Sequence, residues 1–142
     1  MFLRIGIPLT HRQLVEHLVA HDPAYKQELE KLLESLGWSL ETYYSHVEDW
    51  DFYVCAKDLS TRQKLQDMAS RPSSTLLTLG GDDQLYFYED KHNETYLSFP
   101  VMTMDDDKLT NSELATDYEY AVEIFAKAKL PIDKLTWFLN DE

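Results

Sequence analysis

The sequence predicts an α+β protein, with an antiparallel β-meander of three to five strands and about five helices packed on one face of the sheet. Two patterns support this class: apolar residues at helical spacing follow capping residues in the first half, and residues 75–104 hold apolar stretches separated by turn sequences. The length of 142 residues suits one compact domain, residues 1–142.

The first forty residues predict a short strand and a helical hairpin. MFLRIGI has strand character, and Thr10 is placed to cap the first helix. Pro23 suits the first position of the second helix, and Gly37 suits its C-terminal end. The expected core stripes are Leu14, Val15, Leu18 and Val19, then Tyr25, Leu29, Leu32, Leu33 and Leu36.

The next segment predicts a helix, a strand and another helix. Ser39 is a plausible N-cap for a helix whose apolar positions are Leu40, Tyr43, Tyr44 and Val47. Alternation then favours a half-buried strand, with Trp50, Phe52, Val54 and Ala56 inward, Asp51 and Tyr53 outward, and Cys55 in a structural position. The capping box STRQ, residues 60–63, predicts a short helix to about Ser70.

The second half predicts the meander and two helices. Its strands are TLLTL, QLYFYED and TYLSFPVMTM, joined by the turns GGDD and KHNE. The capping box TNSE opens a long helix from Thr110 to about Lys129, and Pro131 begins a short helix that ends at residues 137–139. In the long helix, the core stripe is expected to be Leu114, Ala115, Tyr118, Val122 and Phe125, which leaves Glu119, Tyr120 and Glu123 facing outward.

The charge is strongly acidic, with 13 basic and 26 acidic residues and a net charge of −13. Most of the excess lies in residues 41–53, 82–96 and 105–123. This charge disfavours direct contact with nucleic acid or anionic membrane and favours basic partners or cations. Solubility alone is the simpler explanation for the same charge.

The compartment predicted is the cytoplasm. Cys55 is the single cysteine, which excludes an intramolecular disulfide framework and favours a reducing environment. The N-terminal apolar run is short and interrupted by Arg4, so neither a signal peptide nor a spanning helix is expected there.

Known catalytic motifs are missing from the sequence. It has no G-x-S-x-G, P-loop or dinucleotide-binding pattern, and LGGDD has the character of a hairpin turn. The chain is therefore expected not to be an enzyme, although enzymatic activity stays open, and no cofactor is expected.

Metal ligands are weakly indicated. His17 and His21 have the i, i+4 spacing of two ligands on one helix face, but HLVAH lacks the glutamate of a zincin motif. His46 and Glu48 would diverge on a helix, and the adjacent carboxylates of Asp105–Asp107 do not have EF-hand spacing.

The leading hypothesis is an acidic protein-binding module that inhibits or modulates a basic partner, such as a nuclease or another nucleic-acid-binding protein. It would act as DNA mimics, immunity proteins and anti-defence antagonists do, through charge and aromatic anchors. The contact residues expected are Glu48, Asp49, Asp51, Tyr53, Asp105, Asp106, Asp107, Glu119, Tyr120 and Glu123.

Two alternatives remain. The first is a small-ligand or metal-binding domain, with or without enzymatic activity, that uses His17 and His21. The second is a self-associating accessory protein, which would form a homodimer.

Overall fold

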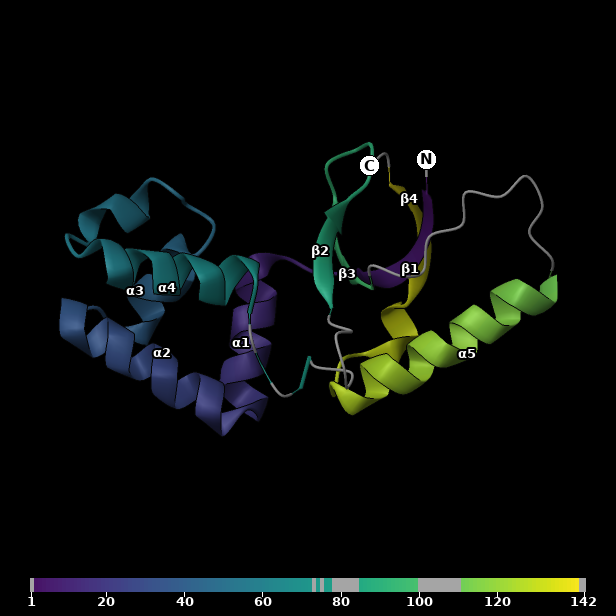
Figure 1. The fold of residues 1–142 in the computed structure, drawn as a ribbon, viewed down its shortest axis with the longest axis horizontal. Coiled ribbons are helices and arrows are strands. Elements are labelled where there is room, and N and C mark those ends of the chain that lie inside the picture. The colour runs from purple at the N-terminus through teal and green to yellow at the C-terminus, as the bar shows by residue number, and fades with distance from the viewer. Residues whose placement is uncertain (1, 73, 75, 78–84, 100–110, 141–142) are drawn as a thin grey trace. The chain divides into compact units, whose positions relative to one another are not determined.

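The computed structural model describes residues 2–72, 74, 76–77, 85–99 and 111–140 (Figure 1). In these ranges the chain forms five α-helices, two short 3-10 helices and a four-stranded antiparallel sheet, so the α+β class is confirmed. Its contacts divide it into two compact units. The helical unit is Thr10–Thr75, and the sheet unit combines Met1–Leu9 with Leu76–Glu142.

The helices of the helical unit begin and end at the capping residues that the sequence offers. They are α1 (His11–His21), α2 (Pro23–Leu36), α3 (Leu40–His46), the 3-10 helix η1 (Phe52–Cys55) and α4 (Leu59–Ser70). Thr10 and Gln13 form a capping box at α1, while the Asp22 carboxylate accepts the backbone N–H groups of Ala24 and Tyr25 at the start of α2. These side chains satisfy helix donors that would otherwise lack partners.

Two buried tyrosines join the helices of this unit to α4. The Tyr25 hydroxyl donates to the Met68 carbonyl at 2.6 Å, and the Tyr43 hydroxyl donates to the Leu65 carbonyl at 3.1 Å. Burial is the main cause that raises the pKa of both phenols above the ordinary value. Both hydroxyls therefore remain protonated donors at neutral pH. Leu14, Leu18 and Leu29 of the same unit are fully buried.

The predicted strand from Trp50 to Ala56 is wrong. The segment turns into η1, whose central Tyr53 is completely buried and donates its hydroxyl to the Val47 carbonyl at 2.7 Å. Val54 and Cys55 are exposed instead. The buried hydrogen bond and the edge contact between the Tyr43 and Tyr53 rings favour a tight turn over an extended segment.

The sheet unit is built around the N-terminal strand. Its elements are β1 (Phe2–Pro8), β2 (Tyr86–Glu89), β3 (Thr95–Ser98), α5 (Asn111–Lys127), the 3-10 helix η2 (Ile132–Lys134) and β4 (Thr136–Asn140). The strand order is β2-β3-β1-β4, so β1 is an inner strand that pairs with β3 and β4. The predicted β2–β3 hairpin is confirmed, and its turn places Asn93 in the left-handed region at φ 62°.

The two faces of the sheet differ in chemistry. One face presents Ile5, Ile7 and Leu97, all fully buried, and α5 meets it through the Phe99–Phe125 ring contact at 5.4 Å. On the other face, Phe138 stacks on Tyr96 at 4.0 Å. These two residues lie on strands that do not pair with each other, so the sheet must curl (Figure 1).

A second set of contacts bridges the curled sheet. Arg4, on β1, lies over the Tyr88 ring of β2 at 3.9 Å and donates to the Asn140 side chain at 3.2 Å. The Asn140 amide in turn donates to the Glu89 carbonyl at 2.8 Å. The two edge strands β2 and β4 are therefore joined at this point.

Several predictions for the sheet unit need correction. The expected C-terminal helix is short, and residues 136–140 form β4, because they pair with β1 over its length. In α5 the buried residues are Ala121, Ile124 and Phe125, whereas Ala115 and Tyr118 are exposed, so the core stripe is turned around the helix axis from the one expected.

Other expected boundaries are shifted or lie outside the described residues. The helix α4 begins at Leu59 with Asp58 as its N-cap, two residues before the predicted cap Ser60. Leu76 and Leu77 lie in a turn, while the rest of the predicted strand TLLTL, the turn GGDD and the cap Thr110 are outside the described residues.

Candidate functional site

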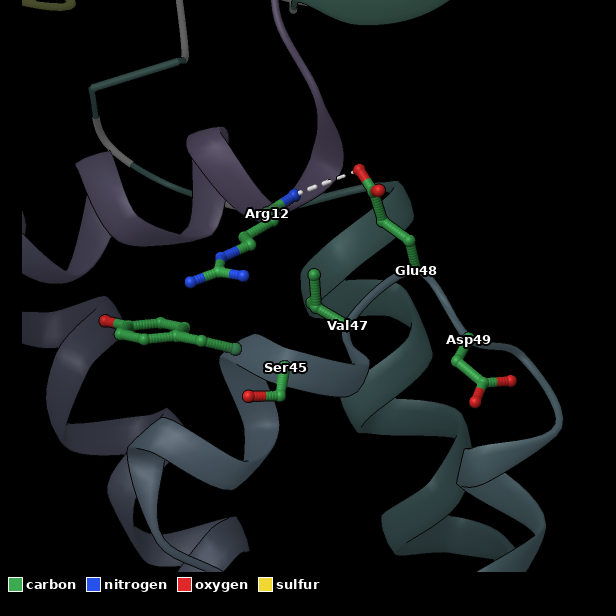
Figure 2. A pocket seen from close by; sticks show the side chains of 6 residues that line it. Arg12, Ser45, Val47, Glu48 and Asp49 are labelled. Carbon is green, nitrogen blue, oxygen red and sulfur yellow. Dashed lines mark hydrogen bonds between the residues drawn. The ribbon is translucent and has the colours of Figure 1, made fainter.

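The surface with the most candidate contact residues lies in the helical unit, where the C-terminal end of α3 meets the start of α1. A Glu48 carboxylate oxygen accepts the backbone N–H of Arg12 at 3.4 Å (Figure 2). The N–H groups in the first turn of a helix carry partial positive charge, so this carboxylate is well placed there. Glu48 thus has a structural role in joining the two helices as well as an exposed charge.

An open pocket of about 310 Å³ lies at this junction. It is lined by Arg12, Tyr44, Ser45, Val47, Glu48 and Asp49. Figure 2 shows the Arg12 guanidinium on one side of Val47 and the Glu48 carboxylate on the other, whereas the Asp49 carboxylate points away from Arg12. The pocket is therefore bordered by two opposite charges, the Arg12 guanidinium and the Glu48 carboxylate.

The Arg12 side chain is held from one edge. Its Nε donates to a Glu16 carboxylate oxygen at 2.6 Å, an i, i+4 pair along α1. Tyr44 is partly buried beside it, and burial, followed by the charge of Glu16, raises the pKa of its phenol. Tyr44 therefore remains a neutral hydrogen-bond donor at physiological pH.

The apolar part of this surface follows directly in the sequence. Trp50, Val54 and Leu59 are three of the eight large hydrophobic side chains exposed on the described residues, and they lie within ten positions of one another. The Trp50 ring is 44% exposed yet supported, because it stacks on Tyr53 at 5.5 Å and meets His11 edge-on at 5.9 Å. Single exposed apolar residues are ordinary, but three of them in one short segment make this segment a candidate interaction surface.

The segment is also fixed in position. Arg62 of α4 donates from Nη2 to the carbonyl groups of Val54 and Ala56 at 3.3 and 2.8 Å. On the other side, His46 stacks on Phe52 at 4.0 Å. The exposed side chains between these two contacts are therefore carried on an ordered backbone.

The acidic residues predicted as contacts are distributed over both units. Glu48, Asp49 and Asp51 are exposed around the Trp50 segment, while the predicted contact Tyr53 is buried below it and does not reach the surface. In the sheet unit, Glu119, Tyr120 and Glu123 are exposed on α5, as expected. Asp105, Asp106 and Asp107 lie outside the described residues.

The histidine pair predicted as a metal ligand set is close together. The rings of His17 and His21 on α1 have centroids 4.5 Å apart. Among the residues that the structure describes, no group of three histidine, cysteine or acidic side chains is arranged to hold a metal ion. The pair could thus supply two ligands of a coordination sphere, with water in the other positions.

Sequence reasoning missed four residues of the surface. Arg12 and Tyr44 line the pocket, and Val54 and Leu59 extend the apolar segment. The i, i+4 spacing of Arg12 and Glu16 was a usable signal, since it predicts an exposed ion pair. The contact between Arg12 and Glu48 joins positions 36 residues apart, and no local pattern predicts it.

The chain has no match among protein-family models, curated protein sequences or solved structures. Of the helices in the described ranges, none combines the length and the apolar character that crossing a bilayer requires.

Proposed function

We propose that this protein is an acidic protein-binding module that inhibits or modulates a basic partner, of the kind that handles nucleic acid. The observation that carries the proposal is the exposed apolar series Trp50, Val54 and Leu59 in a segment bordered by acids. We call Glu48–Leu59 the docking segment.

Its chemistry fits a partner with an apolar centre and a basic rim. Trp50 is a rigid, partly supported aromatic side chain, and such residues dominate the binding energy of many interfaces. Glu48, Asp49, Asp51 and Asp58 border it, and their charges would speed encounter with a positive surface. The net charge of −13 would also attract a positively charged partner, at longer range.

The proposal includes the acids of the sheet unit as a second contact surface. Glu119 and Glu123 lie one helical turn apart on α5, with the exposed Tyr120 between them. Carboxylates on one helix face, roughly 5–6 Å apart, approach the spacing of backbone phosphates, which a nucleic-acid-binding groove recognises. The proposed location is the cytoplasm, which an exposed free Cys55 suits.

A pull-down tests the proposal. The tagged protein would be incubated with nuclease-treated lysate and washed at about 0.1 M or 0.5 M salt, between which screening becomes severe. We expect a basic protein to be retained at low salt, released at high salt and displaced by excess duplex DNA.

Variants then locate the contact. Trp50→Ala should weaken the complex by roughly tenfold or more, as loss of a central anchor does. Ile132→Ala, at a similarly exposed site in the sheet unit, is the matched control. Charge reversal at Glu48 and Asp49, and separately at Glu119 and Glu123, identifies the unit that faces the partner. Unchanged affinity in all of these variants would contradict the proposal.

A metal-binding or small-ligand domain is the second candidate, favoured by the 4.5 Å approach of the His17 and His21 rings. Stoichiometric zinc or nickel in the purified protein, lost in His17→Ala but kept in His92→Ala, would support this function. Metal that stays bound in His17→Ala would exclude this pair as the site.

A further inference from the structure

The pocket beside α1 has features that protein docking does not explain. Arg12, Glu48 and Asp49 line a space of about 310 Å³, with the Arg12 guanidinium and the Glu48 carboxylate on either side of Val47 (Figure 2). A simple anion in this space would meet Glu48, and a simple cation would meet Arg12. A ligand that carries both charges satisfies both walls.

Arg12 is prepared to bind a carboxylate. Its Nε edge is occupied by Glu16 at 2.6 Å, so the side chain presents its two Nη atoms at the free end. Among the described residues no acceptor lies within hydrogen-bonding distance of these two atoms. The paired N–H groups of a guanidinium match the two oxygens of a carboxylate, which makes this the strongest form of the contact.

The opposite wall is prepared to bind an ammonium group. Glu48 uses one oxygen to accept the Arg12 backbone N–H at 3.4 Å, which leaves its second oxygen available. Asp49 follows Glu48 in the chain, but its carboxylate points away from Arg12, and its Oδ2 lies 3.8 Å from His46 Nδ1. The Ser45 and Tyr44 side chains supply neutral polar groups to the same pocket.

We propose that this pocket binds a small zwitterion of the amino-acid class, with its carboxylate on Arg12 and its ammonium group on Glu48. The Arg12 side chain is 54% exposed and Glu48 is exposed as well, so solvent competes for both contacts. Contacts of this exposure each contribute little, so we expect weak binding, with a dissociation constant on the order of tens of millimolar. This site does not depend on the proposed partner, because the ligand is small and needs no second protein.

The test is an NMR titration of the intact ¹⁵N-labelled protein with L-alanine. N-acetyl-L-alanine and L-alanine amide, which each keep only one of the two charges, serve as controls at equal ionic strength. We expect saturable shifts at the amides of Arg12, Ser45 and Glu48 with L-alanine, and at least about tenfold weaker responses with the other two compounds. An equal response to L-alanine amide, or no saturable shift with L-alanine up to about ten times the expected dissociation constant, overturns the proposal.

Variants separate the two walls. Arg12→Gln and Glu48→Gln should each weaken L-alanine binding by about tenfold, and the glutamine at position 48 keeps an acceptor for the Arg12 backbone. Lys26→Gln, which removes a similar i, i+4 pair on α2 outside the pocket, should leave the affinity unchanged. Binding that survives either pocket substitution in a protein with an unchanged melting temperature would overturn the assignment. A failed pull-down with a successful titration would reject the partner proposal alone.

Discussion

The helical unit and the sheet unit are held together over different distances in the sequence. In the helical unit, Tyr25 reaches Met68, 43 positions away, and Tyr53 reaches Val47, six positions away. In the sheet unit, Arg4 contacts Asn140 across 136 positions, and Ser98 donates to Ile5 across 93. The helical unit is therefore built largely from local signals, whereas the sheet unit depends on pairings that only the complete chain can make.

The largest expected effect comes from the core of the helical unit. Leu29→Ala deletes a fully buried side chain and should lower the free energy of unfolding by about 2–5 kcal/mol. Fluorotryptophan labelling with ¹⁹F NMR measures the loss of stability in each unit separately, because Trp38 and Trp50 lie in the helical unit and Trp137 lies in the sheet unit. We expect earlier loss of the native Trp38 and Trp50 signals during denaturation.

The Trp137 signal in the same experiment tests the predicted single domain. If all three signals are lost together, the chain unfolds as one cooperative domain. If Trp137 keeps its wild-type midpoint, the two units are separate domains. Unchanged Trp38 and Trp50 midpoints would contradict the core position assigned to Leu29.

Two glycine substitutions, one in each unit, compare the effect of a close backbone approach with the effect of backbone strain. A Cβ atom at Gly6 would meet the backbone oxygen of Leu97, on the paired strand β3, at 2.4 Å. Gly6→Ala should therefore destabilise the sheet unit by about 2–3 kcal/mol through overpacking. At Gly37 nothing lies within 4 Å, but φ is 70°, so Gly37→Ala should cost about 1 kcal/mol through backbone strain.

Denaturant midpoints of both variants measure the difference. A larger effect at Gly37 than at Gly6 would contradict the close approach of β1 and β3.

Alkaline pH should destabilise the helical unit through its buried tyrosines. Burial is the main cause that raises the pKa of Tyr53 to about 12, while a tyrosine in the unfolded chain ionises near 10. The stabilisation by the neutral phenol is complete below about pH 10 and is lost as the pH rises through about 12. We expect Tyr53 to account for a loss of about 1–3 kcal/mol over this range.

Circular dichroism during denaturation at several pH values checks this prediction. Tyr53→Phe is the control, and its stability should fall less between pH 10 and 12. An identical fall in the variant would assign the alkaline transition to other groups.

The smallest effect belongs to the surface of α5. Glu123 and Lys127 form an exposed ion pair at 3.4 Å, with both side chains mostly in solvent. Glu123→Gln should change the free energy of unfolding by about 0.3–0.5 kcal/mol or less, and this change should vanish at high salt. If the free energy of unfolding falls by more than about 1 kcal/mol and the change does not depend on salt, Glu123 has a role beyond this pair.

The sequence predicted the helices of the helical unit well because their ends are marked by local chemistry. Thr10, Pro23, Gly37 and Ser39 each act at the helix ends expected of them. The C-terminal strand was missed because its β-structure is imposed by β1, which lies more than a hundred residues earlier. The alternation around Tyr53 was misleading. In the tight turn the Tyr53 side chain is buried and its hydroxyl donates to the Val47 carbonyl, so the residues around it do not alternate between inside and outside as they would in a strand.

The candidate site shows the same limit. Exposed acids such as Glu48, Asp49 and Glu119 follow from charge alone, because unpaired carboxylates are rarely buried. The pocket cannot be predicted from charge, because it depends on how the start of α1 meets the end of α3. Position in space, more than residue type, therefore separates Arg12 from the other basic residues of the chain.

The inner position of β1 has a consequence for the synthesis of the chain. β1 leaves the ribosome before its partners β3 and β4, which end at Ser98 and Asn140. At roughly 5–20 residues per second, the strand waits on the order of ten seconds with both edges unpaired, while the helical unit can already fold behind it. During that interval the apolar side chains of Ile5 and Ile7 are unprotected, so the nascent chain is exposed to mispairing and chaperone capture at β1.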